Sequence, residues 1–189
     1  MIFSSQKKFK IFEKKMSWKE NNSFIIMQDC YINELYQTGM KLKNGEGIEI
    51  NKKEASEYFK KAAENGHIDS MYEYGKMLFT GDGIECDKTG SAEYIKNAAE
   101  KGHVKSMLLY AKIIYKECVD KKDFNEIIHY LKMAIDYGDQ DAMLKYGLLL
   151  YTGTGIDENK AEATKLFKLG AEKNHAESMF YYGYALLEE

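Results

Sequence analysis

The stretch MYEYGKMLFTGDGIECDKTGSAEYIKNAAEKGH, residues 71–103, decides the fold, because its pattern returns every 36 residues. Its opening MYEYG is matched by MLLYA at 107–111, MLKYG at 143–147 and MFYYG at 179–183, with a weaker copy, LYQTG, at 35–39. A repeat of this length forms a stack of similar units, because no single unit can bury its own apolar face. Function is then expected on the surface that the stack creates.

Each unit is expected to contain two helices. Met71, Tyr74 and Leu78 recur at helical spacing and predict a first helix, here called helix A, which the glycines of Gly81-Asp82-Gly83 end. A second helix, helix B, is expected to begin at a residue with a capping side chain. The four predicted N-caps are Asn51, Asp87, Asp123 and Asn159, and three of them are followed three residues later by a glutamate, as in a capping box: Glu54, Glu126 and Glu162.

The repeat resembles the Sel-one-like repeat family, a relative of tetratricopeptide repeats. The resemblance depends on the Leu/Tyr-Gly pair of helix A, the Gly-x-Gly-Ile turn and the helix B run that ends Ala-Ala-x-x-Gly, and it covers residues 31–189 as four units and a final helix A. It implies adaptors that bind other proteins. We expect an all-α fold, a right-handed α/α superhelical solenoid of antiparallel helix pairs, with about nine helices from residue 31 onward.

Residues 1–30 are expected to form a basic extension, either partly disordered or a helix that caps the first repeat, with the repeat domain at 31–189. Residues 1–22 hold six lysines and two glutamates, and no apolar run of signal-peptide length follows. Phe9, Phe12 and Met16 share a helical face, so a membrane anchor is the alternative. No transmembrane segment is evident, and a soluble protein is expected.

Composition narrows the possible partners. The net charge is −3 and all 27 basic residues are lysine, so the chain lacks the bidentate arginine that favours phosphate recognition. Nucleic acid is therefore not expected as a partner. Three cysteines without a pairing pattern favour a reducing compartment, and we expect a cytoplasmic protein.

Three motifs resemble chemical sites but are better explained structurally. Equivalent histidines at 67, 103 and 175 would lie too far apart to share a metal ion, and a loop-capping role is expected. The Gly-x-Gly turns follow helices and lack the lysine of a phosphate loop. Cys118 lies between Lys116 and Lys121 but has no evident base. No catalytic residue, metal or cofactor is predicted.

The concave surface of helix A is the predicted partner site. In the Tyr-Gly register its columns give twelve candidate residues: Tyr36, Tyr72, Lys76, Phe79, Leu108, Lys112, Tyr115, Leu144, Leu148, Tyr151, Phe180 and Tyr184. Aromatic and apolar side chains with scattered lysines suit a peptide with anchoring residues. The alternative is that one column, the one with Phe79, Tyr115 and Tyr151, is core between repeats.

These observations favour a non-enzymatic adaptor or scaffold that binds a protein or peptide on its concave surface. A hydrolytic enzyme and a structural fragment of a larger multidomain protein are the alternatives. The third unit departs from the pattern, with Ala111 for the helix A glycine and with Glu117 and Val119 for the turn glycines. The final helix A carries more apolar residues than one buried stripe uses, which predicts an exposed patch and either self-association through this helix or a continuation of the natural chain.

Overall fold

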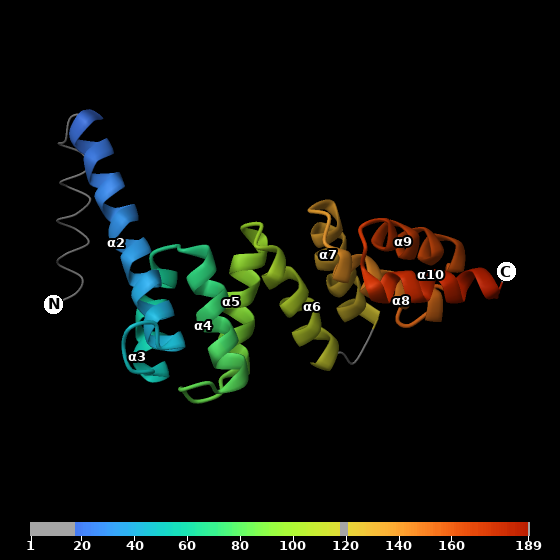
Figure 1. The fold of residues 1–189 in the computed structure, drawn as a ribbon, viewed down its shortest axis with the longest axis horizontal. Helices are drawn as coiled ribbons and strands as arrows, with labels where there is room; N and C mark the ends of the chain where they lie inside the picture. Colours follow the sequence, from blue (N-terminus) through green and yellow to red (C-terminus); the bar gives the residue numbers. More distant parts are fainter. Residues whose placement is uncertain (1–17, 118–120, 189) are drawn as a thin grey trace. The chain divides into compact units, whose positions relative to one another are not determined.

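The described part of the chain is helical outside its turns. The computed structural model describes residues 18–117 and 121–188, and the side chains of 25–116 and 124–188. Within these residues lie nine helices in succession and no strand (Figure 1). They are α2 (Trp18–Asn44), α3 (Lys52–Glu64), α4 (Ile68–Thr80), α5 (Lys88–Glu100), α6 (Val104–Glu117), α7 (Lys121–Asp136), α8 (Gln140–Thr152), α9 (Lys160–Glu172) and α10 (Ala176–Leu187). The predicted all-α fold is confirmed.

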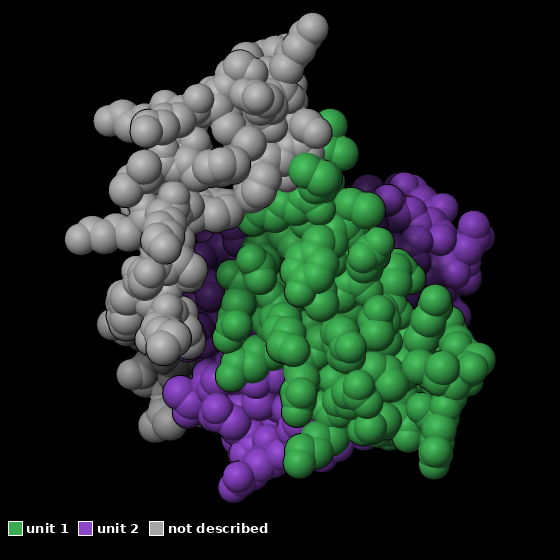
Figure 2. Space-filling model, turned by 90° about the vertical axis from the view of Figure 1, so that its left-hand side faces the viewer, with its two compact units in different colours: residues 1–70 green, residues 71–189 purple. Residues whose placement is uncertain are grey.

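The chain divides into two compact units, residues 1–70 and residues 71–189 (Figure 2). The first contains α2, α3 and the start of α4, and the second contains the rest of α4 and the helices α5 to α10. The expected boundary at residue 31 lies inside α2, so the first helix A is the C-terminal part of a longer helix. Phe9, Phe12 and Met16 lie outside the described residues. Every helix of the described part is too short or too polar to cross a bilayer.

Helix B begins at the predicted caps in three of the four units. Asn51, Asp87 and Asn159 each accept the backbone N–H of the residue three positions on, at 3.1, 2.9 and 3.0 Å. The prediction for Asp123 is wrong, because α7 begins at Lys121 and Asp123 therefore lies inside its first turn.

The glutamates do not complete a reciprocal capping box. The backbone N–H of Asn51 donates to the Leu42 carbonyl at 2.9 Å, a bond formed by the incoming turn. The Glu54 carboxylate instead accepts from the side-chain amide of Asn51 at 3.0 Å. The incoming turn thus satisfies the donor that a capping-box glutamate would take.

The Gly-x-Gly segments are tight turns. All six of their glycines, at 45, 47, 81, 83, 153 and 155, have φ between 66° and 78°, the left-handed region that side chains disfavour. This confirms the predicted role in the turn between helices A and B. Val119 and Cys118, at the equivalent place in the third unit, lie outside the described residues.

The histidines cap the following helix A, as predicted. The Nδ1 atoms of His67, His103 and His175 accept the backbone N–H three residues on, a serine in each case, at 3.2, 3.2 and 3.3 Å. The same serine hydroxyls lie 2.9, 2.7 and 2.8 Å from Nδ1. At the equivalent place in the third unit Asp139 accepts the N–H of Ala142 at 2.8 Å. An acceptor at this position satisfies an N–H that the helix leaves open.

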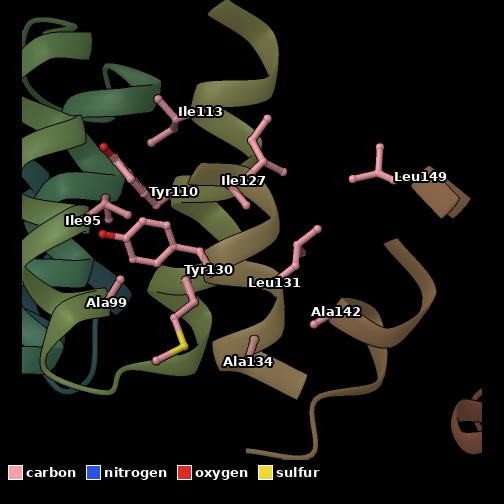
Figure 3. Packing of buried hydrophobic residues seen from close by; sticks show 12 residues of the cluster. Ile95, Ala99, Tyr110, Ile113, Ile127, Tyr130, Leu131, Ala134, Ala142 and Leu149 are labelled. Carbon is pink, nitrogen blue, oxygen red and sulfur yellow. The ribbon is translucent and has the colours of Figure 1, made fainter. Parts of the chain in front are cut away.

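The helix A glycine gives helix B close access. A Cβ added at Gly39, Gly75 or Gly147 would lie within 2.8 Å of the side chain twenty residues later, at positions 59, 95 and 167. Those side chains, Phe59, Ile95 and Phe167, are completely buried. In the third unit the equivalent pair is Ala111 and Leu131, also buried. Both belong to one apolar cluster, part of which Figure 3 shows between α5, α6, α7 and α8.

Candidate functional site

A groove of about 580 Å³, here called the central groove, lies within residues 71–189. It is lined by α4, α6, α7 and α8 through thirteen residues: Tyr72, Lys105, Leu108, Leu109, Ala111, Lys112, Tyr115, Ile127, Leu131, Asp141, Lys145, Leu148 and Leu149. Five predicted partner-binding residues are brought together here: Tyr72, Leu108, Lys112, Tyr115 and Leu148. Successive helix A segments supply them, as the repeat register predicts.

The floor of the groove belongs to the apolar core. Ile127 and Leu131 from α7 and Leu149 from α8, all labelled among the packed core residues in Figure 3, are at most 9% exposed and belong to the groove lining. Their burial fixes the floor, because a core side chain cannot move without disturbing its neighbours. Tyr115, by contrast, is 52% exposed, and its ring meets the Phe124 ring edge-on with the centroids 6.0 Å apart.

Three exposed lysines give the rim a positive charge. Lys105 and Lys112 lie on α6 and Lys145 lies on α8. Within the described side chains, none of the three has a carboxylate within 4.0 Å. The single acid of the lining, Asp141, pairs with His175, with 3.2 Å between Oδ1 and Nε2. The groove therefore combines an apolar floor with cations available to a ligand.

The other predicted residues lie outside the groove lining. Leu144 is only 4% exposed and packs in the core with Phe167. Phe79 is partly buried against the core, with the Lys116 ammonium 5.5 Å from its ring centroid. The Lys76 ammonium lies 5.9 Å from the Tyr72 ring centroid.

The remaining three candidates of residues 71–189 lie near the end of the chain. Tyr151 and Tyr184 both donate hydrogen bonds to the Glu188 carboxylate. Hydrogen bonding to this carboxylate raises the pKa of Tyr151 to about 12. Phe180 is 66% exposed on α10. Within residues 1–70, Tyr36 packs on His67 with ring centroids 4.7 Å apart.

Sequence reasoning missed the other eight lining residues, among them Lys105, Leu109 and Lys145. Leu109 and Lys145 each follow a predicted residue by one position, at Leu108 and Leu144. On α8, Lys145 lines the groove while Leu144 lies in the core. Carrying the same repeat position from helix to helix therefore assigns the wrong residue of this pair to the groove. Reading both neighbouring positions of helix A would have found the two residues.

Sequence reasoning also missed an arrangement that resembles a catalytic triad. The Ser178 hydroxyl lies 2.8 Å from His175 Nδ1, and His175 Nε2 lies 3.2 Å from Asp141. Ser178 is 0% exposed, and the Nδ1 that a general base would use already accepts a backbone N–H. A nucleophile must reach substrate and lose its proton to that base. The His-x-x-Ser pairs at 67–70 and 103–106 repeat the arrangement as caps, which explains it without catalysis.

A second cavity, of about 530 Å³, is polar and lies at the start of α8, where it adjoins His175, the N-cap residue of α10. Its lining includes Asp139 and Asp141, but Asp139 caps α8 and Asp141 pairs with His175. No three His, Cys, Asp or Glu side chains of the described residues gather closely enough to bind a metal ion. Its polar groups thus already have structural roles.

The successive helix pairs and the groove on their A helices define a helical repeat protein of the solenoid class. The family model described as Sel1 repeat matches residues 35–67, 68–103 and 140–175, more than half of the sequence. The chain therefore belongs to the Sel1 repeat family. Residues 104–139, the third unit, are not among the matched repeats. Proteins of this family are commonly protein-interaction scaffolds and are generally non-catalytic.

Two solved structures share the fold. A Sel1 repeat protein from Oxalobacter formigenes superposes with a TM-score of 0.74 at 24% identity, over 80% of this chain and 60% of that one. A protective antigen of uropathogenic Escherichia coli strains with an SLR fold superposes with a TM-score of 0.50 at 20% identity, over 85% of this chain and 42% of that one. This chain thus spans less than two thirds of either structure. No curated protein matches the sequence.

Proposed function

We propose that the protein is a non-enzymatic adaptor whose central groove binds a peptide segment with apolar anchoring residues flanked by acidic ones. The observation that carries the proposal is the pairing of a buried apolar floor with three rim lysines, Lys105, Lys112 and Lys145. Carboxylates of a ligand would meet these cations, while its apolar side chains would cover Leu108 and Leu148.

The unusual third unit supports this site. Nearly half of the groove residues come from α6, which is helix A of the repeat that the family model leaves out. Among the groove residues of α6, Ala111 departs from the repeat pattern, whereas Leu108, Lys112 and Tyr115 have the same residue types as Leu144, Lys76 and Tyr151 of other units. A specialised contact accounts for that departure without any disturbance of the stack, because the unit keeps the length of 36 residues.

The cellular setting is a further part of the proposal. Cys30 and Cys86 are exposed free thiols. Exposed thiols persist where glutathione keeps them reduced. They support a cytoplasmic adaptor.

Random dodecapeptides displayed on phage, selected against the intact chain, test the groove directly. We expect enrichment of sequences with leucine or an aromatic residue next to aspartate or glutamate. A fluorescent peptide from that selection should lose about tenfold or more in affinity when Lys112→Glu and Lys145→Glu are combined, because two attractions become repulsions. Its binding should also weaken with added salt.

The matched control combines Lys88→Glu with Lys168→Glu, which makes the same change of net charge at exposed positions of α5 and α9. This variant should bind the peptide as the wild type does. Selected peptides without acidic residues, or equal loss in both variants, would contradict the proposal. Thermal melts of both variants show whether the fold is retained.

A further inference from the structure

Asp141 gives the α8 wall of the central groove a negative charge. Of the described residues that line this groove it is the one acid, against the three lysines of the rim. Its side chain is 59% exposed, so the carboxylate is open to a ligand. A groove that takes only apolar and acidic side chains has no use for this charge, which lies one helical turn from Lys145 and weakens the attraction of that lysine for an anion.

The hydrogen bond that Asp141 makes with α10 requires an acceptor but no charge. His175 Nδ1 accepts the backbone N–H of Ser178, so the proton of the neutral ring is on Nε2, and this N–H donates to Asp141. Within residues 1–70 the same contact, between a histidine and the residue 34 positions earlier, joins His67 Nε2 to Asn33 Oδ1 at 3.2 Å. A neutral amide thus fills the structural role of Asp141, and the fold does not explain its charge.

The same hydrogen bond keeps the carboxylate from neutralising the rim. Asp141 and Lys145 are four residues apart on α8, the spacing at which a carboxylate and an ammonium pair on a helix. Within the described side chains, however, Lys145 has no carboxylate within 4.0 Å, and Asp141 Oδ1 lies 3.2 Å from His175 Nε2. His175 is therefore a positioning residue, which leaves an anion and a cation side by side and both open to a ligand.

Along α8 the groove wall presents an acid, a base and apolar side chains in that order. A helical rise of about 1.5 Å per residue places Asp141 about 6 Å from Lys145 along the axis, and Lys145 about 5 Å from Leu148 and Leu149. A ligand that lies extended along α8 advances about 3.3 Å per residue, so its complementary side chains would stand about two residues apart.

The polar cavity at the start of α8 gives a long side chain room beside Asp141. Asp141 lines both this cavity and the central groove. Asp139 also belongs to the cavity lining, and no lysine is among its described lining residues. One ammonium already lies at its edge, because Lys173 Nζ donates to the Gly138 carbonyl at 3.3 Å. The two carboxylates outnumber that cation, so the surroundings favour a further positive charge.

We propose that Asp141 is a specificity-determining residue of the central groove, which selects peptides with a lysine or arginine about two residues beyond the acidic one, on the side away from the apolar anchors. This inference rests on the proposed function and extends it from a composition to an order: basic, acidic, apolar. The basic side chain would meet Asp141 at the mouth of the polar cavity, the acid would meet Lys145, and the anchors would cover Leu148. An acid in place of the basic residue would face Asp141 and be disfavoured.

The fluorescent dodecapeptide from the phage selection is the probe that tests this order. We would make it in two forms, with lysine or with glutamate two residues beyond its acid, and measure the Kd of each for the intact chain by fluorescence anisotropy. The lysine form should bind about tenfold more tightly, although the three rim lysines taken alone would favour the glutamate form. Asp141→Asn should remove this preference, and Asp141→Lys should reverse it.

Two further variants separate recognition from stability. Asp157→Asn, at an exposed position of the loop between α8 and α9, makes the same change of net charge as Asp141→Asn and should keep the preference of the wild type. His175→Asn keeps an acceptor for the Ser178 N–H but frees Asp141 to pair with Lys145, so the affinities for the two peptide forms should become more similar. Thermal melts of all variants show whether the fold is retained.

Equal affinity of the wild type for the two peptide forms overturns the proposal, and this comparison needs no variant. A preference that survives in Asp141→Asn overturns it as well. The combined Lys112→Glu and Lys145→Glu variant distinguishes this failure from failure of the proposed function. If the peptide loses affinity in that variant but shows no preference at the tested position, the groove binds peptides and Asp141 does not select them. If the peptide binds that variant and the wild type alike, both proposals are wrong.

Discussion

The same substitution, glycine to alanine, is expected to have opposite effects at two equivalent positions of the repeat. At Gly147 an added Cβ would lie 2.6 Å from Cε1 and 3.0 Å from Cδ1 of Phe167, well inside van der Waals contact. The Phe167 ring is completely buried and cannot turn away without displacing its neighbours. At Gly183 the added Cβ would meet no described atom within 4 Å.

The magnitudes follow from these two environments. Alanine is more favourable than glycine in the interior of a helix by about 1 kcal/mol, so Gly183→Ala should raise the free energy of unfolding by about 0.5–1 kcal/mol. At Gly147 overpacking of about 1–3 kcal/mol opposes that gain, which leaves a net loss of about 1 kcal/mol. The two variants should then differ by about 2 kcal/mol, roughly a 30-fold difference in the ratio of folded to unfolded protein.

Urea unfolding followed by far-UV circular dichroism measures this difference. The third unit supplies the control, because it carries Ala111 and Leu131 at the two positions. Gly147→Ala should cost less in a Phe167→Leu background than in the wild type. If Gly147→Ala proves as stable as the wild type, or costs the same in both backgrounds, the close approach of the helices does not limit stability.

Two further predictions concern the ends of helices. Burial lowers the pKa of His67 below 6.5, so the unfolded chain binds a proton at higher pH than the folded chain, and the free energy of unfolding should fall as the pH drops below about 6.5. His67→Asn keeps an acceptor for the Ser70 N–H, and in thermal melts from pH 7.5 to 5 it should lose less stability than the wild type. An identical loss would contradict the role of His67 in this pH dependence. Glu188→Ala removes the acceptor of the Tyr151 hydroxyl, so amide hydrogen exchange at 181–187 should become faster; unchanged exchange would mean that this carboxylate does not hold α10.

Periodicity predicted the fold well because each signal was local and recurred. The cap at Asn51 and the turn glycines at 45 and 47 are decided by a few neighbouring backbone groups, which the sequence displays directly. Their recurrence in register then identified helices A and B. The cap predicted at Asp123 was wrong where that register weakens, since α7 begins at Lys121, three residues earlier than that cap predicts.

The site was predicted less completely, because exposure depends on how each helix is rotated against its neighbours. Tyr72 and Leu108 line the groove as expected, whereas Leu144, in the same column, is buried and Lys145 takes its place. A small rotation of a helix about its axis, equivalent to one residue, decides whether a side chain lies in the core or in the groove. The alignment of the repeats does not show this rotation. The exposed apolar residues of α10, such as Phe180 and Leu187, were predictable, because they follow from an excess of apolar residues in one helix.

The exchange of Gly and Phe for Ala and Leu in the third unit bears on how four similar repeats find their correct neighbours as the chain folds. A helix B that carries Phe59 or Phe167 requires a glycine opposite, as the close approaches to Gly39 and Gly147 show. Ala111 carries a methyl group that such a ring would meet too closely, so packing of those helices on α6 is disfavoured by about 1–3 kcal/mol of overpacking. The third unit thus disfavours out-of-register docking of those helices on α6, which reduces the number of ways in which similar segments can pair as the chain folds.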